Sequence, residues 1–112
     1  MTRQQAAEFL SGYKRSKKQK HYLENLLKEM QEEKGSELFC KRIRKEISEE
    51  WQRMQDIQVA LNRLENEDGK AILYCRFIMG LGVQETAERV FMSSRHVQRI
   101  TNKALDELAS KF

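Results

Sequence analysis

The sequence predicts an all-α protein. Its 112 residues include no proline and five glycines, so few positions interrupt a helix. Apolar residues recur at three- and four-residue steps along most of the chain, and the alternation typical of a half-buried strand is absent. A turn at Asn66–Gly69 divides the chain into an N-terminal helical hairpin, which bends at Gly35–Ser36, and a C-terminal group of three helices, which bends around residues 79–82.

The N-terminal hairpin is expected to begin with helices over residues 3–13 and 16–34. Each of these segments has apolar residues on one side at helical spacing. Gly35 suits the end of a helix, and the Ser36 hydroxyl is placed to cap the helix that follows. The chain is therefore expected to turn back on itself at this point.

The next helix is expected to be long, from Glu37 to Asn66. Its heptad a and d positions hold Cys40, Ile43, Ile47, Glu50, Met54, Ile57, Leu61 and Leu64. Only Glu50 interrupts this apolar seam, and Trp51 beside it is positioned to cover the gap. Such a coiled-coil-like seam needs a partner, which is either the preceding helix or the same helix of a second subunit. Because the apolar face of Leu23–Met30 is shorter than the seam, we expect a homodimer through the long helix, with packing on its own domain as the alternative.

Residues 67–112 form the second predicted region, joined to residues 1–66 by a turn at Asn66–Gly69. Helices are expected over residues 71–78, over residues 83–90 and from Ser94 onward. A bend at residues 79–82 and a three-residue break at Phe91–Ser93 separate them. A short helix, a tight turn and an amphipathic helix in this order are the layout of a helix-turn-helix DNA-binding domain.

The last helix carries the candidate DNA contacts. Its inward face is apolar, with Val97, Ile100, Ala104, Leu105 and Leu108 at helical spacing. On the outward face we expect Arg95, Gln98 and Arg99 to read bases, because Arg binds guanine edges bidentately and Gln binds adenine. The candidate contacts to the DNA backbone are Ser94, His96, Asn102 and Lys103. The alternative is an ordinary solvated helix face that contains arginines.

These residues also carry a resemblance to known families. Residues 71–108 resemble region 4 of the sigma-70 family through Val97–Ile100 and Lys103–Leu105. Over nearly its whole length the chain is similar to small phage proteins, the ArpU/RinA-type transcriptional regulators, in which a helical section and a long helix precede a sigma-region-4-like helix-turn-helix. The matching motifs are Arg76–Phe77, Gly80, Glu85–Ala87 and Ser93–Arg99. The resemblance implies a regulator of phage or prophage genes, and activation rather than repression.

Three residues depart from that pattern. Thr86 occupies a position that is usually Ile or Leu, and Gly82 replaces the common Ser or Thr cap. Phe91 stands in a turn that usually carries Gly or Asn, where a positive φ would be costly for a large side chain. We therefore expect either a different turn geometry or packing of Phe91 against the upstream helices.

A second basic cluster lies in the N-terminal half. Its cations are Lys14, Arg15, Lys17, Lys18 and Lys20. Such a cluster is typical of a surface that contacts DNA phosphates or an acidic protein, and a solvated helix face is the alternative. His21 follows it without a nearby cysteine or second histidine, so no metal site is predicted there.

The charge and composition of the chain, and the motifs it lacks, limit the classes of function to expect. A net charge of +4 and a pI near 9.2 favour nucleic acid as a partner. No run is apolar enough to span a membrane and no signal peptide is recognisable, so we expect the bacterial host cytoplasm. Cys40 and Cys75 are expected to be reduced, buried residues. The sequence contains no phosphate-binding loop, metal-spaced cluster or nucleophile motif, so neither a cofactor nor an enzyme is predicted.

The sequence leaves three functions to compare. The first is a sequence-specific DNA-binding transcription regulator. The second is a DNA-binding assembly or packaging protein of the phage small-terminase type, although those proteins usually place the helix-turn-helix before the coiled coil. The third is a sigma-like protein that binds RNA polymerase without reading DNA.

Overall fold

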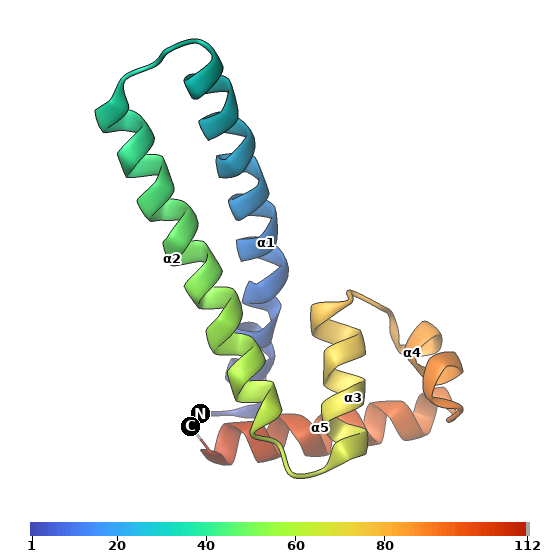
Figure 1. The fold of residues 1–112 in the computed structure, drawn as a ribbon. Helices are drawn as coiled ribbons and strands as arrows, with labels where there is room; N and C mark the ends of the chain where they lie inside the picture. Colours follow the sequence, from blue (N-terminus) through green and yellow to red (C-terminus); the bar gives the residue numbers. More distant parts are fainter. Residues whose placement is uncertain (112) are drawn as a thin grey trace.

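The computed structural model describes residues 1–111, and every regular element in that range is helical (Figure 1), which confirms the predicted all-α fold. The elements are α1 (Arg3–Glu32), α2 (Glu37–Asn62), α3 (Glu67–Leu73), the π-helical turn η1 (Tyr74–Ile78), α4 (Val83–Val90) and α5 (Ser94–Lys111). Helices α1 and α2 form an antiparallel hairpin, and α5 crosses below the base of that hairpin and below α3 (Figure 1). None of the described helices is long and apolar enough to cross a lipid bilayer.

One continuous helix, α1, replaces the two segments predicted before residue 35. It begins after Thr2, whose hydroxyl accepts the Gln5 N–H at 3.1 Å while the Gln5 side chain accepts the Thr2 N–H at 2.8 Å. This capping box fixes the first turn. Lys14 and Arg15, where two helices were expected to meet, are good helix formers, so nothing in the local sequence ends the helix there.

The length of α1 decides how the seam on α2 is covered. The seam residues Cys40, Ile43, Ile57 and Leu61 are only 2–3% exposed, and α1 and α2 pack side by side. A helix of 30 residues spans about 45 Å, which is longer than the 26-residue α2. The expectation that the preceding helix is too short to cover the seam is therefore wrong, and the seam gives no reason for a dimer.

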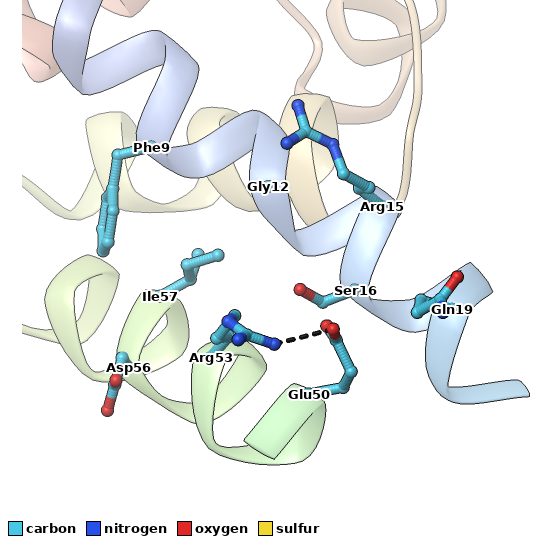
Figure 2. A pocket seen from close by; sticks show the side chains of 9 residues that line it. All are labelled: Phe9, Gly12, Arg15, Ser16, Gln19, Glu50, Arg53, Asp56 and Ile57. Atoms are coloured by element: carbon cyan, nitrogen blue, oxygen red, sulfur yellow. Dashed lines mark hydrogen bonds and ion pairs between the residues drawn. The ribbon is translucent and has the colours of Figure 1, made fainter. Parts of the chain in front are cut away.

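Glu50, the charged residue of the seam, lies where α1 offers small side chains. Gly12 and Ser16 face it across a groove of about 510 Å³ between the two helices (Figure 2). The Glu50 carboxylate accepts a hydrogen bond from Arg53 at 2.6 Å, so its charge is paired at the groove. Trp51 is 48% exposed and does not cover this position, contrary to the prediction.

The connection between α2 and α3 differs from the predicted turn. Helix α2 ends at Asn62 rather than Asn66, and Asn66 caps α3 by accepting the Gly69 N–H at 2.8 Å. Gly69 is buried in the first part of α3, and a Cβ atom there would lie 3.0 Å from the Cβ atom of Ala104 on α5. Gly69 therefore permits close packing of two helices rather than a turn.

Two hydrophobic cores hold the fold together. The main core takes residues from α1, α2, α3, α5 and the loop after α2: Ala6, Leu10, Tyr13, Ile57, Ala60, Leu61, Leu64, Leu73, Ala104, Leu105, Leu108 and Ala109. The small core of Ile72, Ala87 and Val97 holds α4 against α3 and α5. The predicted boundary between residues 66 and 67 falls at the start of α3, and the main core is shared across it.

Candidate nucleic-acid interface

The bend before α4 is built around Gly80. Its φ of 74° is a left-handed conformation that glycine adopts without steric cost. Just beyond it, the Leu81 N–H donates to the Cys75 carbonyl at 2.9 Å and closes the end of η1. Gly82 then stands at the cap of α4 without a side-chain hydrogen bond, so α4 begins where the sequence predicts but without the usual Ser or Thr cap.

Helix α4 packs on α5 through the small core. Ala87, which is 5% exposed, keeps the distance between the two helices short. Thr86 beside it is fully buried, and its hydroxyl has no hydrogen-bond partner among the described residues. A buried hydroxyl without a partner destabilises a protein by about 1–3 kcal/mol. Thr86 is therefore a weak point of the packing between α4 and its neighbours.

The turn between α4 and α5 contains Phe91 in a left-handed conformation, with φ 57° and ψ 44°. Its side chain is 95% exposed. Both expectations for Phe91 are therefore wrong, because the turn keeps a left-handed residue and the ring does not pack against the upstream helices. Ser93 closes the turn, since its hydroxyl accepts the His96 N–H at 3.1 Å and caps α5 as predicted.

Helix α5 has one buried and one exposed face. Val97, Ala104 and Leu108 are at most 3% exposed and pack into the two cores. Thr101 is buried with them, and its hydroxyl donates to the Val97 carbonyl at 2.8 Å. The predicted base-reading residues Arg95, Gln98 and Arg99 are all exposed. The structure therefore brings these three side chains together on the solvent side of α5.

The predicted backbone contacts flank this group. Ser94, His96 and Lys103 are exposed, and Asn102 is half-buried with a long contact of 3.5 Å to Gln98. His96 and Lys103 line a groove beside the first turn of α3, which Asp68 also lines. They thus lie on the α3 side of the exposed face, at its margin rather than at its centre.

Charge is segregated along α5. Residues 94–103 contain cations and no acidic residue, and no ion pair within the described residues involves Arg95, Arg99 or Lys103. The two acids of α5, Asp106 and Glu107, follow in its C-terminal half and both have partners. The exposed N-terminal half of α5 is therefore a surface of free hydrogen-bond donors, suited to an anionic ligand.

Arg3 of α1 neutralises Asp106, the first acid that follows that surface along α5. Its Nε and Nη2 atoms donate to the Asp106 oxygens at 2.9 and 2.8 Å. These hydrogen bonds hold the pKa of the Asp106 carboxyl below its usual value, and the carboxylate in turn raises the pKa of Arg3. Asp106 follows Arg99 and Asn102 at helical spacing, so it lies on the same face of α5. Its ion pair with Arg3 therefore neutralises a negative charge on that exposed face.

Glu107 holds the loop before α3. Its carboxylate accepts the Glu65 N–H at 2.9 Å, and this hydrogen bond is the main reason that the pKa of Glu107 lies below its usual value. Lys111 lies 3.5 Å from the same carboxylate and donates to the Arg63 carbonyl at 2.7 Å. Both contacts tie the end of α2 to α5.

The predicted second basic cluster is divided by the structure. Lys14, Lys17 and Lys18 line a groove of about 360 Å³ together with His21 and residues 77–80 of η1 and the bend. Arg15 lines the other groove, between α1 and α2, where its guanidinium points away from the Glu50–Arg53 ion pair (Figure 2). Lys20 is paired with Glu24 at 3.0 Å. Three lysines of the cluster thus face the bend that leads into α4.

Residues 1–111 offer few side chains arranged for metal binding or thiol chemistry. Among residues 1–111, no three His, Cys, Asp or Glu side chains gather in a way that could hold a metal ion. Cys40 is buried and Cys75 half-buried, and both are free thiols. Unpaired cations gather instead on the exposed face of α5 and in the lysine groove on α1, and a third group, Lys41, Arg42 and Lys45, lines a groove near the start of α2.

Comparison with known proteins assigns the chain to no family. No protein-family model, no curated protein and no solved structure matches the chain. The resemblance to ArpU/RinA-type regulators and to sigma-70 region 4 therefore stays a prediction that rests on its motifs.

Proposed function

We propose that the chain is a sequence-specific DNA-binding transcription regulator, in which α5 enters the major groove. The observation that carries this proposal is the division of α5 into a buried apolar face and an exposed face with unpaired Arg95 and Arg99. A recognition helix contacts base edges with its N-terminal residues, and this is the half of α5 that has cations and no acids. Arg and Gln are the side chains that read guanine and adenine edges.

The other candidate contact residues extend this role. Ser94, His96, Asn102 and Lys103 contact phosphates on either side of the groove, because they flank the base-reading residues. Lys14, Lys17 and Lys18 add attraction for the DNA backbone near the entrance to α4, with Arg15 and Lys20 as minor contributors. Phosphate contacts position the protein and base contacts supply the sequence preference.

The resemblance to ArpU/RinA-type proteins extends the proposal to the regulation of phage or prophage genes, with activation as the sign and the host cytoplasm as the location. RNA polymerase is then the second partner, and no cofactor is involved. A packaging protein of the small-terminase type remains the alternative. A large ring in solution would favour packaging, whereas a monomer or dimer favours regulation.

A homodimer through α2 remains part of the proposal, but it needs a face other than the buried seam. Trp51 and Val59 on α2 are each 48% exposed, and neither belongs to a hydrophobic core of the chain. A dimer would double the DNA contact and match two half-sites. Sedimentation equilibrium of the full chain and of Trp51→Glu measures this directly, since a charge at such an interface would dissociate the dimer. A wild-type mass equal to one chain at all concentrations would contradict it.

The decisive experiment is selection of binding sites from random duplex DNA. The wild type should enrich a motif that an Arg95→Ala/Arg99→Ala variant no longer selects. Arg42→Ala/Lys45→Ala is the matched control, because it removes two exposed cations from the far end of α2 and should select the same motif. If the wild type enriches nothing, sequence-specific regulation is wrong and polymerase binding becomes the better proposal.

Single variants separate the two kinds of contact. Arg95→Ala should lose about 1–3 kcal/mol of discrimination at one base position and leave the others unchanged. Lys103→Ala should weaken all DNA sequences similarly and reduce the slope of log affinity against log salt by about 1. Equal weakening of selected and random DNA by Arg95→Ala would show that Arg95 does not read a base.

A further inference from the structure

The turn before α5 contains a residue whose conformation and exposure both oppose folding. Phe91 has φ 57° and ψ 44°, where the Cβ atom of an L-residue crowds the following carbonyl oxygen. Among the described residues only Lys34 and Phe91 combine a side chain with a positive φ. Glycine or asparagine would adopt this conformation more easily. The backbone of the turn therefore does not favour a phenylalanine.

Packing within the chain does not explain why position 91 is a phenylalanine either. Phe91 is 95% exposed, more than Leu38 at 79% or Tyr22 at 61%, and it belongs to neither hydrophobic core. Burial of a phenylalanine normally offsets an unfavourable conformation, and here almost none of the ring is buried. A strained residue that contributes nothing to the folded chain is a candidate for contact with another molecule.

The position of Phe91 limits which chemical groups of another molecule its ring could contact. It lies two residues before the Ser93 cap and four before Arg95, at the end of α5 that the proposed function places in the major groove. Most groups at that surface of DNA are polar or charged, but thymine presents a C5-methyl group in the major groove, and apolar side chains including Phe contact it. An exposed aromatic ring four residues before Arg95, at the same end of α5, matches that arrangement.

We propose that Phe91 contacts the C5-methyl group of a thymine next to the bases read by Arg95 and Arg99, and so sets a preference for T·A at that position. The inference rests on the proposed DNA-binding function. It assigns a specificity-determining role to a residue outside the recognition helix. It also accounts for a phenylalanine where the turn itself favours glycine.

The test combines a protein variant with a change in the DNA alone. Phe91→Gly should raise the melting temperature by a few degrees, because strain is relieved and no packing is lost, so poor folding cannot explain a loss of binding. In site selection it should lose the preference for thymine at one position and keep the bases read by Arg95 and Arg99. Lys34→Gly is the matched control: it relieves the other positive φ, in the loop after α1, and should leave the selected motif unchanged.

Replacing that thymine by deoxyuridine removes only the methyl group. Wild-type affinity should fall about fourfold, the equivalent of roughly 0.8 kcal/mol for one buried methyl-sized group. Phe91→Gly should bind the two duplexes equally. Equal binding of both duplexes by the wild type, or an unchanged thymine preference in Phe91→Gly, would overturn the inference. A wild type that selects no motif would instead overturn the proposed function itself, so the two failures are distinct.

Discussion

The main core is large, whereas the small core has few residues and is bordered by several that are locally unfavourable. The main core joins four helices through twelve buried residues, and Leu10, Leu73 and Leu108 in it are 0% exposed. The small core has three buried residues, Ile72, Ala87 and Val97. Around it lie the Thr86 hydroxyl without a partner, the Gly82 cap without a side-chain hydrogen bond and the left-handed Phe91. Three unfavourable local features thus lie at α4 and the turn that follows it, and the others among the described residues are the positive φ of Lys34 after α1 and the buried Arg76 Nη1 without a partner in η1.

This difference is what the proposed DNA-binding function would lead one to expect. Residues that oppose local stability tend to gather at binding sites, because contacts with a ligand rather than contacts within the chain select them. The same regions open at lower free energy than the rest of a structure. Under the proposed DNA-binding function, the main core would support and orient α5, and α4 with its turn would form the less stable part of the interface.

The largest effect expected is from a cavity in the main core. Leu108→Ala should lower the free energy of unfolding by about 2–5 kcal/mol, since Leu108 is fully buried between the hairpin and the C-terminal helices. Chemical denaturation followed by far-ultraviolet circular dichroism and by the fluorescence of Trp51 measures it. Because the core is shared, both signals should shift together.

Leu38→Ala is the control for that variant, since Leu38 is 79% exposed and its loss should change stability by less than about 0.5 kcal/mol. Separate transitions for the two signals in Leu108→Ala would mean that the hairpin and the C-terminal helices unfold independently. The contrast between one shared core and one local core would then be wrong.

A smaller effect, of opposite sign, is expected in the small core. Thr86→Val keeps the shape of the side chain and removes a buried hydroxyl that has no partner, so the free energy of unfolding should rise by about 1 kcal/mol. Thr101→Val is the matched control, because the Thr101 hydroxyl donates to the Val97 carbonyl and its loss should bring no gain. Thermal unfolding of the two variants under the same conditions compares them. Equal changes would show that the Thr86 hydroxyl is not a weak point.

The smallest effect expected is on the stability of the fold at low pH. The Glu65 N–H holds the pKa of Glu107 below its usual value in the folded chain, so this carboxylate stabilises the fold above its unfolded pKa. That contribution is lost as the pH falls through the lowered folded pKa. The melting temperature of the wild type should therefore fall more steeply below the ordinary glutamate range than that of Glu107→Gln.

Glu33→Gln is the control, because it removes an exposed carboxylate from the loop after α1. It should follow the wild type throughout the same pH range. Identical pH profiles for Glu107→Gln and the wild type would mean that the contact between Glu107 and the loop before α3 contributes nothing to stability.

Sequence alone determined the local features of this protein. The absence of proline and the helical spacing predicted an all-α fold, and α4 and the start of α5 lie where Gly82 and the Ser93 cap placed them. The buried and exposed faces of α5 also agree with its periodicity, because a helix face is set by residues three and four apart. These features depend on near neighbours in the chain, which the sequence contains in full.

Tertiary structure decided which surfaces meet. Periodicity identified the apolar seam on α2 but not its partner, and the length of α1 assigned that seam to the same chain. The pairing of Arg3 with Asp106 joins residues 103 positions apart, and no local pattern predicts it. The division of the basic cluster on α1 and the full exposure of Phe91 depend likewise on where other helices lie. A sequence states which side chains need a partner, and only packing in three dimensions determines which of them receive one.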